Sequence, residues 1–208
     1  MSDPLARSPI RPPEPLIVLA GWEVSGRRAA GALTLTDCTP LAKVLLRAPV
    51  GGQAAGELEV PLGRARRNAA DVLVVGSGPG EWLLLGPPGQ AADIAARLDE
   101  VASQVSEAVS VTDLTHGRAL IRLTGPKAAD VLSAVCGIDL SDAVTPDGAA
   151  FRSSLAALAT DVIRDDVAGV RSYLLHCERS SGQYLFDALL SAGRDLGIEI
   201  DGFTPPGI

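Results

Sequence analysis

Residues 111–137 read V-T-D-L-T-H-G-R-A-L-I-R-L-T-G-P-K-A-A-D-V-L-S-A-V-C-G, and this stretch has the clearest structural pattern in the chain. A polar turn at 113–117 leads into a segment in which apolar side chains alternate with Arg118 and Arg122. A period of two puts both arginines on one face and small or branched apolar groups on the other. The pattern predicts a half-buried strand whose arginines face away from the core.

A helix is expected to follow this strand. Thr124-Gly125-Pro126 interrupts the alternation, and proline suits the first helical position because its missing N–H would have no intrahelical partner there. Apolar residues then recur at helical spacing until a terminating glycine. We expect Ile121 and Leu123 of the strand to be buried beside Val131 and Leu132 of the helix.

The same kinds of pattern extend over residues 71–193. Two strands precede a helix at 91–102, and three strands follow a loop at 138–149 and precede a last helix. The predicted strands around these helices cover residues 72–75, 81–85, 109–111, 151–158, 161–164 and 170–177. Helices thus separate groups of strands. This order predicts an α+β fold with a mixed or antiparallel sheet, helices on one face and split β-α-β units.

The N-terminal part is less regular. Residues 1–15 are rich in proline, serine and arginine and contain no apolar run, so we expect a disordered tail and not a signal peptide. Residues 16–208 are expected to form a single α+β domain. Within it, residues 16–70 show only short strand patterns, and residues 51–70 cannot be assigned.

Composition and charge exclude several classes of function. The formal net charge is -7, and no cluster of Lys and Arg outweighs it, so we expect no binding to nucleic acid. No apolar run approaches the ~18 residues of a transmembrane helix, and we expect no membrane association. The three cysteines are an odd number and widely spaced, as is usual for buried, reduced thiols in a cytoplasmic protein.

Motifs for catalysis, cofactors or metals are not found in the sequence. Gly76-x-Gly78-x-Gly80 precedes a strand and not a helix, so it predicts a hairpin turn and not a dinucleotide site. The two histidines are 60 positions apart without cysteines or carboxylates at ligand spacing, so no metal site is expected. His176 and Cys177 are neighbours on a strand and point to opposite faces. Asp165-Asp166 is interpreted as a solvated turn.

Asp113, His116 and Arg118 form the most notable polar set, and two interpretations stay open. Asp113 can bind the amides of the turn while Arg118 lies on a solvated face. Alternatively, the three residues form a contact surface for a ligand or a partner. Their spacing alone does not separate these interpretations.

Four segments resemble the gamma subunit of heterotetrameric sarcosine oxidase. Residues 113–118 and 121–128 are similar to its D-x-S-H-G-R and I-R-x-S-G-P-K-A patterns, and residues 78–84 are similar to its G-P-D-E-W-L-L. Residues 136–140 and the segment from Arg179 resemble its D-L-H region and its last helix. The family's pattern is not kept everywhere, because Ser141, Ala48 and Thr115 replace a histidine, a glycine and a serine.

The resemblance implies a fold and a function. That family is similar to the amino-terminal part of the glycine-cleavage T-protein, which implies the α+β folate-binding-type fold. It implies a cytoplasmic, non-catalytic gamma-type subunit of a flavin-dependent oxidase complex that acts on sarcosine. Flavin and folate are then expected on partner subunits, with no cofactor on this chain, which would pack against the large alpha subunit. The alternative is a stand-alone or differently partnered homologue in amine or one-carbon metabolism that binds a small molecule in its central groove.

A subunit without chemistry acts through its contacts, in which arginine and tryptophan are enriched. Arg118 and Arg122 lie opposite the predicted apolar face, and His116 ends the preceding turn. We therefore expect Asp113, His116, Arg118 and Arg122 to border a partner or ligand surface. Trp82, which follows a Gly/Pro turn, is a further candidate.

Overall fold

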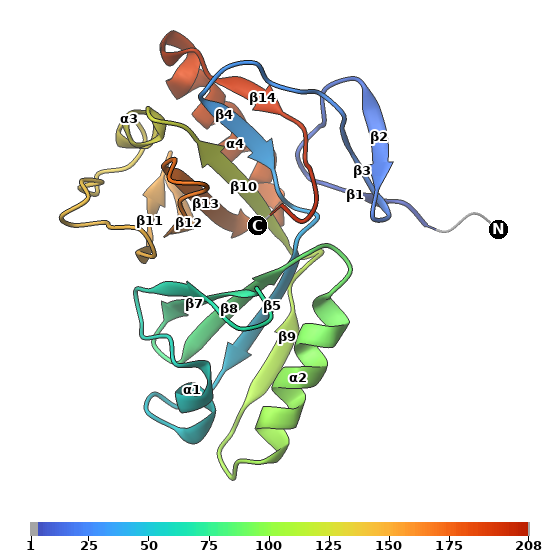
Figure 1. The fold of residues 1–208 in the computed structure, drawn as a ribbon, viewed down its shortest axis with the longest axis vertical. Helices are drawn as coiled ribbons and strands as arrows, with labels where there is room; N and C mark the ends of the chain where they lie inside the picture. Colours follow the sequence, from blue (N-terminus) through green and yellow to red (C-terminus); the bar gives the residue numbers. More distant parts are fainter. Residues whose placement is uncertain (1–3, 208) are drawn as a thin grey trace.

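The computed structural model describes residues 4–207, which contain three β-sheets and four α-helices (Figure 1). A six-stranded and a five-stranded sheet form two lobes, and a small three-stranded sheet of N-terminal residues lies beside the first. The candidate site lies between the two larger sheets.

The six-stranded sheet has the order β11-β12-β13-β10-β4-β14. Its strands are β4 (Thr34–Asp37), β10 (Arg118–Thr124), β11 (Ala150–Leu155), β12 (Leu158–Arg164), β13 (Ser172–Glu178) and β14 (Glu199–Asp201). Only the β14–β4 pair is parallel, so the sheet is mixed. Helices α3 (Ala128–Ser133) and α4 (Gly182–Gly193) bury their apolar residues against one face of this sheet. Short 3-10 turns, η1 (Arg179–Ser181) and η2 (Arg194–Leu196), flank α4.

The five-stranded sheet has the order β6-β7-β8-β5-β9 and is antiparallel. Its strands are β5 (Ala42–Arg47), β6 (Ala65–Arg67), β7 (Leu73–Gly78), β8 (Glu81–Gly86) and β9 (Ser110–Asp113). Helix α2 (Ala91–Ser103) buries Ile94 and Leu98 against one face, together with α1 (Gln53–Leu58). The glycines at 76–80 form the β7–β8 hairpin, as predicted.

β10 is central and buried on both faces, which corrects the prediction of a half-buried strand. Ile121 and Leu123 lie in one core with Val131 and Leu132, as expected. The opposite face meets a second core, which the five-stranded sheet also lines. Arg122 on that face is only 8% exposed. The prediction was wrong because a distant part of the chain covers this face, and the local alternation cannot report such a cover.

The predicted fold class is confirmed: the fold is α+β, and helices lie on one face of a mixed sheet. The helix expected at 91–102 is α2, which ends one residue later. The helix after β10 is shorter than its apolar stripe suggests, because α3 ends at Ser133. Apolar periodicity therefore located these elements better than it located their ends.

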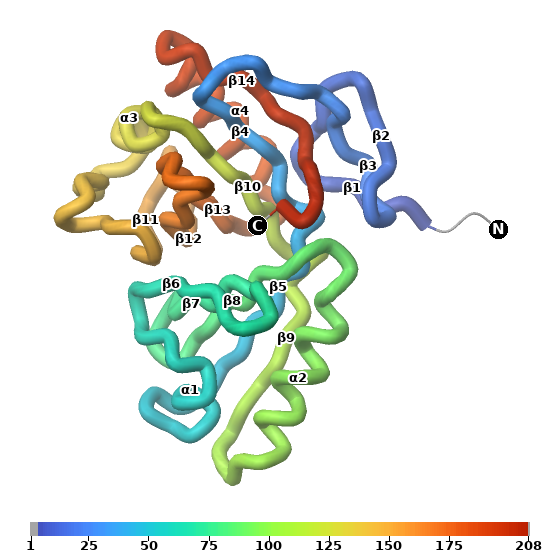
Figure 2. The backbone as a smooth tube through the Cα atoms, viewed as in Figure 1, coloured from blue at the N-terminus to red at the C-terminus, as the bar shows by residue number. Residues whose placement is uncertain are grey.

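The chain crosses between the two large sheets twice, at 38–41 and at 114–117 (Figure 2). The crossings are held to the adjoining strands by hydrogen bonds. Lys43 N donates to Thr115 Oγ1 at 3.0 Å, and Leu120 N donates to Thr39 Oγ1 at 3.2 Å. Leu114 N donates to the carbonyl of Lys43 at 2.7 Å. The polar turn of the opening motif is thus the second crossing, which fixes one sheet against the other.

The N-terminal segment, which was expected to be a disordered tail, contains paired strands and a buried residue over its described part. β1 (Ala6–Arg7) pairs with β3 (Trp22–Ser25), and β2 (Leu16–Leu19) lies on the other side of β3. Ile10 is 1% exposed and belongs to the core of the six-stranded sheet. A proline-rich segment lacks periodicity, but it can still lie extended along a sheet. Residues 1–3 lie outside the described part, and the division into a tail and one domain stays a prediction.

Candidate functional site

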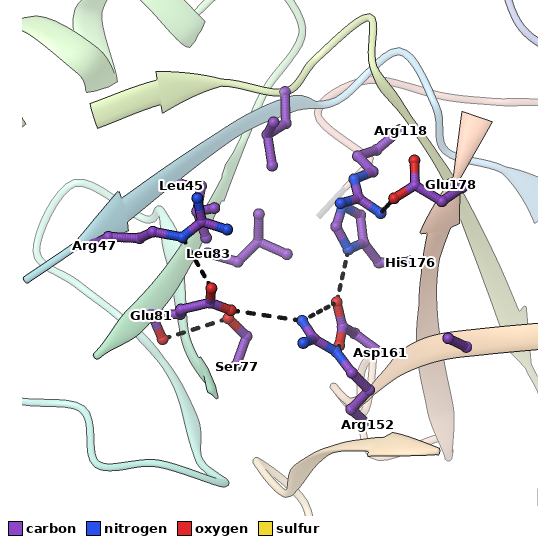
Figure 3. Close-up of a pocket in the computed structure, with 12 residues that line it drawn as sticks. Leu45, Arg47, Ser77, Glu81, Leu83, Arg118, Arg152, Asp161, His176 and Glu178 are labelled. Carbon is purple, nitrogen blue, oxygen red and sulfur yellow. Dashed lines mark hydrogen bonds and ion pairs between the residues drawn. The ribbon is translucent and has the colours of Figure 1, made fainter. Parts of the chain in front are cut away.

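A cavity of about 220 Å³ lies between the two large sheets (Figure 3). Its wall is mainly charged, with a smaller apolar part formed by leucine and alanine side chains. The polar lining residues are Arg47, Ser77 and Glu81 from one sheet, and Arg118, Arg152, Asp161, His176 and Glu178 from the other. The arrangement combines arginine donors, carboxylates and one histidine in a single hollow.

A chain of ion pairs bridges the two sheets across this cavity (Figure 3). Arg47 Nε donates to Glu81 at 2.9 Å, and the other oxygen of Glu81 lies 3.7 Å from Arg152. Arg152 Nε donates to Asp161 Oδ1 at 2.6 Å. Asp161 Oδ2 lies 3.0 Å from His176 Nδ1. Because Arg47 and Arg152 are more than half exposed, the outer pairs contribute little stability, and their effect is to orient the Asp161 carboxylate.

The surroundings of His176 favour the neutral form of its imidazole. Burial lowers the pKa of His176 and outweighs the opposite effect of its contact with Asp161. Burial raises the pKa of Asp161, but hydrogen bonds from His176 and Arg152 lower that pKa overall. A neutral ring beside a carboxylate donates from Nδ1. Nε2 is then an acceptor, and it is buried without a partner among residues 4–207.

Arg118 is the one sequence-predicted site residue that lines this cavity. It lies directly opposite Glu178 in the β10–β13 pairing, and the two side chains form an ion pair. The Arg118 side chain is 31% exposed. Arg118 therefore lies where it can meet either solvent or a bound molecule.

Asp113 and His116 lie at a different hollow. Asp113 Oδ1 accepts a hydrogen bond from Thr115 N at 2.8 Å, which holds the turn of the second crossing. The ring of His116 stacks on Trp22 with 4.9 Å between centroids and 10° between planes, and it thereby joins the crossing to the N-terminal sheet. Both residues are exposed and line a hollow of about 480 Å³ beside Leu5. Asp113 thus holds the turn, as the first interpretation states, and the accessible side chains leave the second interpretation a prediction.

Arg122 and Trp82 are buried, in contrast to the expectation that they border a partner or ligand surface. Arg122 donates to Asp165 Oδ2 at 2.7 Å and to Ser172 Oγ at 2.8 Å. Trp82 is 7% exposed, and its Nε1 donates to the carbonyl of Val60 at 2.8 Å. The structure therefore does not bring the five predicted residues together.

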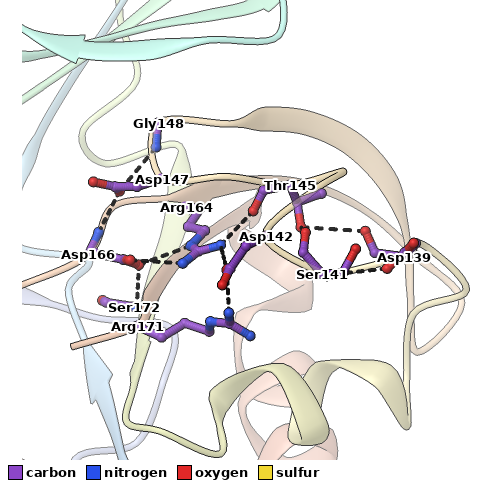
Figure 4. A network of polar contacts seen from close by, with 10 residues as sticks. All are labelled: Asp139, Ser141, Asp142, Thr145, Asp147, Gly148, Arg164, Asp166, Arg171 and Ser172. Carbon is purple, nitrogen blue, oxygen red and sulfur yellow. Dashed lines mark hydrogen bonds and ion pairs between the residues drawn. The ribbon is translucent and has the colours of Figure 1, made fainter. Parts of the chain in front are cut away.

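The Asp165-Asp166 pair is also not the solvated turn that the sequence suggested. Asp165 accepts from both Arg122 and Arg67, and it is 9% exposed. Asp166 pairs with Arg164, which also reaches Asp142 and the carbonyl of Thr145 in the loop before β11 (Figure 4). Arg171 joins the same carboxylate of Asp142. These aspartates fasten the loop and the β12–β13 turn, and this is a structural role.

The sequence reasoning missed the Asp161–His176 pair. The two residues lie directly opposite each other in the antiparallel β12–β13 pair. Both strands were predicted, so the pairing required only the register of the hairpin between them. That register is set by the turn at 165–171, which has no simple two-residue signature.

Other reactive groups in the described part of the chain are inert or dispersed. The three cysteines are buried and form no disulfide there, and burial raises the pKa of Cys38 to about 12 and that of Cys177 to about 11. Cys177 faces the core while His176 faces the cavity, as expected from their alternation. Over residues 4–207, no three His, Cys, Asp or Glu side chains are grouped as metal ligands. None of the helices in this range has the length and apolar character needed to cross a membrane.

Known proteins that are similar in sequence to this chain are longer than the chain itself. The chain is 26% identical over 193 residues to an aminomethyltransferase of Saccharopolyspora erythraea, with 86% of this chain and 51% of that protein covered. It is 36% identical over 92 residues to sarcosine oxidase subunit alpha of Rhizobium meliloti, with 43% of this chain and 9% of that protein covered. The chain thus spans about half of the first relative and a small part of the second.

A solved structure and a family model cover more of the chain. A chain of heterotetrameric sarcosine oxidase from Corynebacterium sp. U-96 has the same fold, with a TM-score of 0.69, 24% identity, and 81% of this chain and 88% of that chain covered. The model of the GCVT N-terminal domain matches residues 60–204, from just before β6 to just after β14. This match includes well over half of the residues, most of the strands of both large sheets, and every polar residue of the cavity except Arg47. The chain therefore belongs to the GCVT N-terminal domain family.

Proposed function

We propose that this chain is a non-catalytic, gamma-type subunit of a flavin-dependent oxidase complex that acts on sarcosine or a similar N-methyl amino acid. In this proposal the flavin and the folate are bound by partner subunits. The chain packs against a large alpha-type subunit, and the complex works in the cytoplasm.

The end-to-end correspondence with a chain of a heterotetrameric sarcosine oxidase carries this proposal. The superposition includes 81% of this chain and 88% of that chain. The alignment with the aminomethyltransferase, by contrast, includes only about half of that enzyme. A match that uses most of both chains supports a role like that of this subunit more than the role of an aminomethyltransferase.

The chemistry of the described side chains is consistent with a non-catalytic role. A thiol acts as a nucleophile only as a thiolate, and the raised pKa values of Cys38 and Cys177 keep both protonated at neutral pH. The arginines and carboxylates of the cavity are already engaged in ion pairs with one another.

The partner surface in this proposal contains Asp113, His116 and Arg118. All three are exposed or half-buried, and they lie within the second crossing between the sheets or directly beside it. Arg122 and Trp82 are excluded from it because they are buried. The accessible outer side of a rigid crossing suits a stable interface, since little conformational entropy is lost there on binding.

The test is co-purification of the tagged chain with a candidate large subunit. We expect a complex that consumes oxygen in the presence of sarcosine, whereas the chain alone should be colourless and inactive. Arg118→Ala should weaken assembly by about 1–2 kcal/mol, and the matched surface variant Arg66→Ala should not. A flavin spectrum that stays with the isolated chain after desalting would contradict the proposal, as would equal recovery of the complex with wild type and Arg118→Ala.

A stand-alone homologue in amine or one-carbon metabolism is the second candidate. The observation in its favour is the cavity with its unpartnered His176 Nε2, because an isolated chain can use such a site without other subunits. Size-exclusion chromatography of the native lysate separates the two candidates. A chain that elutes at its own mass favours the stand-alone role, and co-elution with a flavoprotein favours the subunit role.

A further inference from the structure

His176 presents an unsatisfied hydrogen-bond acceptor at the wall of the cavity between the sheets. Its side chain is 4% exposed, and its Nδ1 is engaged by Asp161 at 3.0 Å. Nε2 is buried, with no hydrogen-bond partner in the part of the chain that the structure describes. A buried acceptor that lacks a donor loses the free energy of its hydration without compensation. A donor group delivered into the cavity would restore that free energy.

The charges around the imidazole are balanced. Three arginines and three carboxylates line the cavity, and since the ring is neutral, these charges sum to zero. The ion pairs are Arg47–Glu81, Arg118–Glu178 and Arg152–Asp161. A ligand with a net charge of either sign would leave one charge without a counter-charge, whereas a zwitterion would not. The cavity therefore favours a ligand without net charge, and because its wall carries charges of both signs, a zwitterion suits it better than an uncharged molecule.

Arg118 and Glu178 can complement the two ends of such a ligand. Arg118 lies beside the imidazole of His176 in Figure 3, and its side chain is 31% exposed, so a rotation of this side chain would open the ring nitrogen to the cavity. A guanidinium has five N–H donors, and one ion pair leaves several of them for a second carboxylate. Glu178 and His176 lie on the same face of β13, so a cation at Nε2 is also near a carboxylate.

We propose that this cavity binds a small zwitterionic amino acid whose N–H donates to His176 Nε2 and whose carboxylate is held by Arg118. The size of the cavity agrees with a ligand of few heavy atoms. Its volume of about 220 Å³ lies below the ~300–1,000 Å³ of sites for drug-sized ligands, so it suits a ligand much smaller than a flavin or a nucleotide. The site belongs to the isolated chain, so this inference does not depend on membership of an oxidase complex.

The most direct test observes the ring nitrogen itself. The chain has only two histidines, so ¹⁵N-histidine labelling gives NMR signals from two imidazole rings. In the His116→Gln variant the remaining signals belong to His176. Addition of glycine should shift the Nε2 resonance of His176 as the bare acceptor gains a donor, while the His116 ring should not respond. An unchanged His176 Nε2 resonance at saturating glycine would overturn the proposal.

A ligand series tests the need for the N–H group. N,N-dimethylglycine retains one N–H, and glycine betaine differs from it by a single methyl group and has none. In titration calorimetry, betaine should bind about tenfold or more weakly than dimethylglycine, the expected effect of losing one charge-assisted hydrogen bond. Glycolate, which keeps the carboxylate but lacks the positive group, should also bind more weakly than glycine. Equal binding of dimethylglycine and betaine, or tighter binding of glycolate, contradicts the zwitterion site.

Two variants and a control complete the test. His176→Phe keeps an aromatic ring but removes the acceptor, so it should bind dimethylglycine and betaine equally. His176→Phe changes a buried side chain and can prevent folding. In that case Arg118→Gln tests the proposal through the carboxylate contact, because Arg118 is partly exposed and its replacement should not disturb the fold. It should weaken glycine binding by roughly tenfold without lowering Tm. Arg66→Gln removes an exposed arginine of the Arg66–Glu59 pair outside the cavity and should bind like wild type. Wild-type affinity in Arg118→Gln would exclude the proposed carboxylate contact.

Discussion

Replacement of Lys43 by methionine should change how the free energy of unfolding depends on pH. Lys43 is fully buried on β5, and its Nζ donates to the carbonyl oxygens of Thr39 and Leu41 at 2.7 and 2.8 Å. Burial lowers the pKa of this lysine from its ordinary 10.5 to about 7. A neutral amine has two N–H donors, which match the two carbonyls, whereas an ammonium group has a third donor to satisfy.

The sign of the effect follows from the proton balance. Between about pH 7 and pH 10, the unfolded chain holds a proton on Lys43 that the folded protein has released. The free energy of unfolding therefore rises with pH in this window, by slightly more than ~1 kcal/mol per pH unit and about 4 kcal/mol in total. Below about pH 7 Lys43 is protonated in both the folded and the unfolded chain, so the free energy of unfolding no longer depends on pH through this residue. The folded protein then bears the whole cost of the buried charge.

Urea unfolding followed by circular dichroism across this pH window measures the effect. The difference in unfolding free energy between wild type and Lys43→Met should grow steadily as pH rises from about 7 to 10. The chain's other lysine, Lys127, is exposed, so Lys127→Met is the matched control and should run parallel to wild type. A constant difference between wild type and Lys43→Met over the window would refute the assignment of a buried neutral amine.

Three further substitutions test the packing around the site by urea unfolding. Tyr173→Phe should leave stability unchanged or raise it by about 1 kcal/mol, because the fully buried hydroxyl has no partner in the described part of the chain; a clear loss would reveal one. Arg122→Met should cost about 3 kcal/mol, since it removes a buried partner of Asp165, and a near-neutral result would contradict the buried ion pair. Arg118→Ala should change stability by less than ~0.5 kcal/mol, because its ion pair with Glu178 is partly exposed, and a larger loss would assign it a structural role.

The order of the elements could be predicted because it depends on local patterns. The alternation of apolar and polar side chains predicted β10, and apolar side chains at the 3.6-residue helical period predicted α2. The glycine-rich segment at 76–80 predicted the hairpin between β7 and β8. Each of these signals lies within one segment of the chain. The cover on the second face of β10 comes instead from residues far away in the sequence, so the burial of Arg122 could not be recognised from its neighbours.

The candidate site was predictable only in part. Arg118 was identified because it follows the polar turn and lies opposite the predicted apolar face of the strand, and it does line the cavity. His176 was recognised as facing away from Cys177, but Asp161 could not be paired with it without the register of β12 and β13. Arg47 and Glu81 come from the other sheet, and no pattern within a segment brings them near a histidine more than ninety residues later.

The sequence by itself determined the type and order of most strands and helices, the α+β class and the resemblance to the family. These features follow from side-chain periodicity and turn residues, which act over a few residues. The tertiary structure alone decided which faces are buried, which carboxylate pairs with which arginine, and where the cavity lies. Those outcomes depend on the packing of two sheets across a shared core, where residues distant in the chain compete for the same volume and the same hydrogen-bond partners.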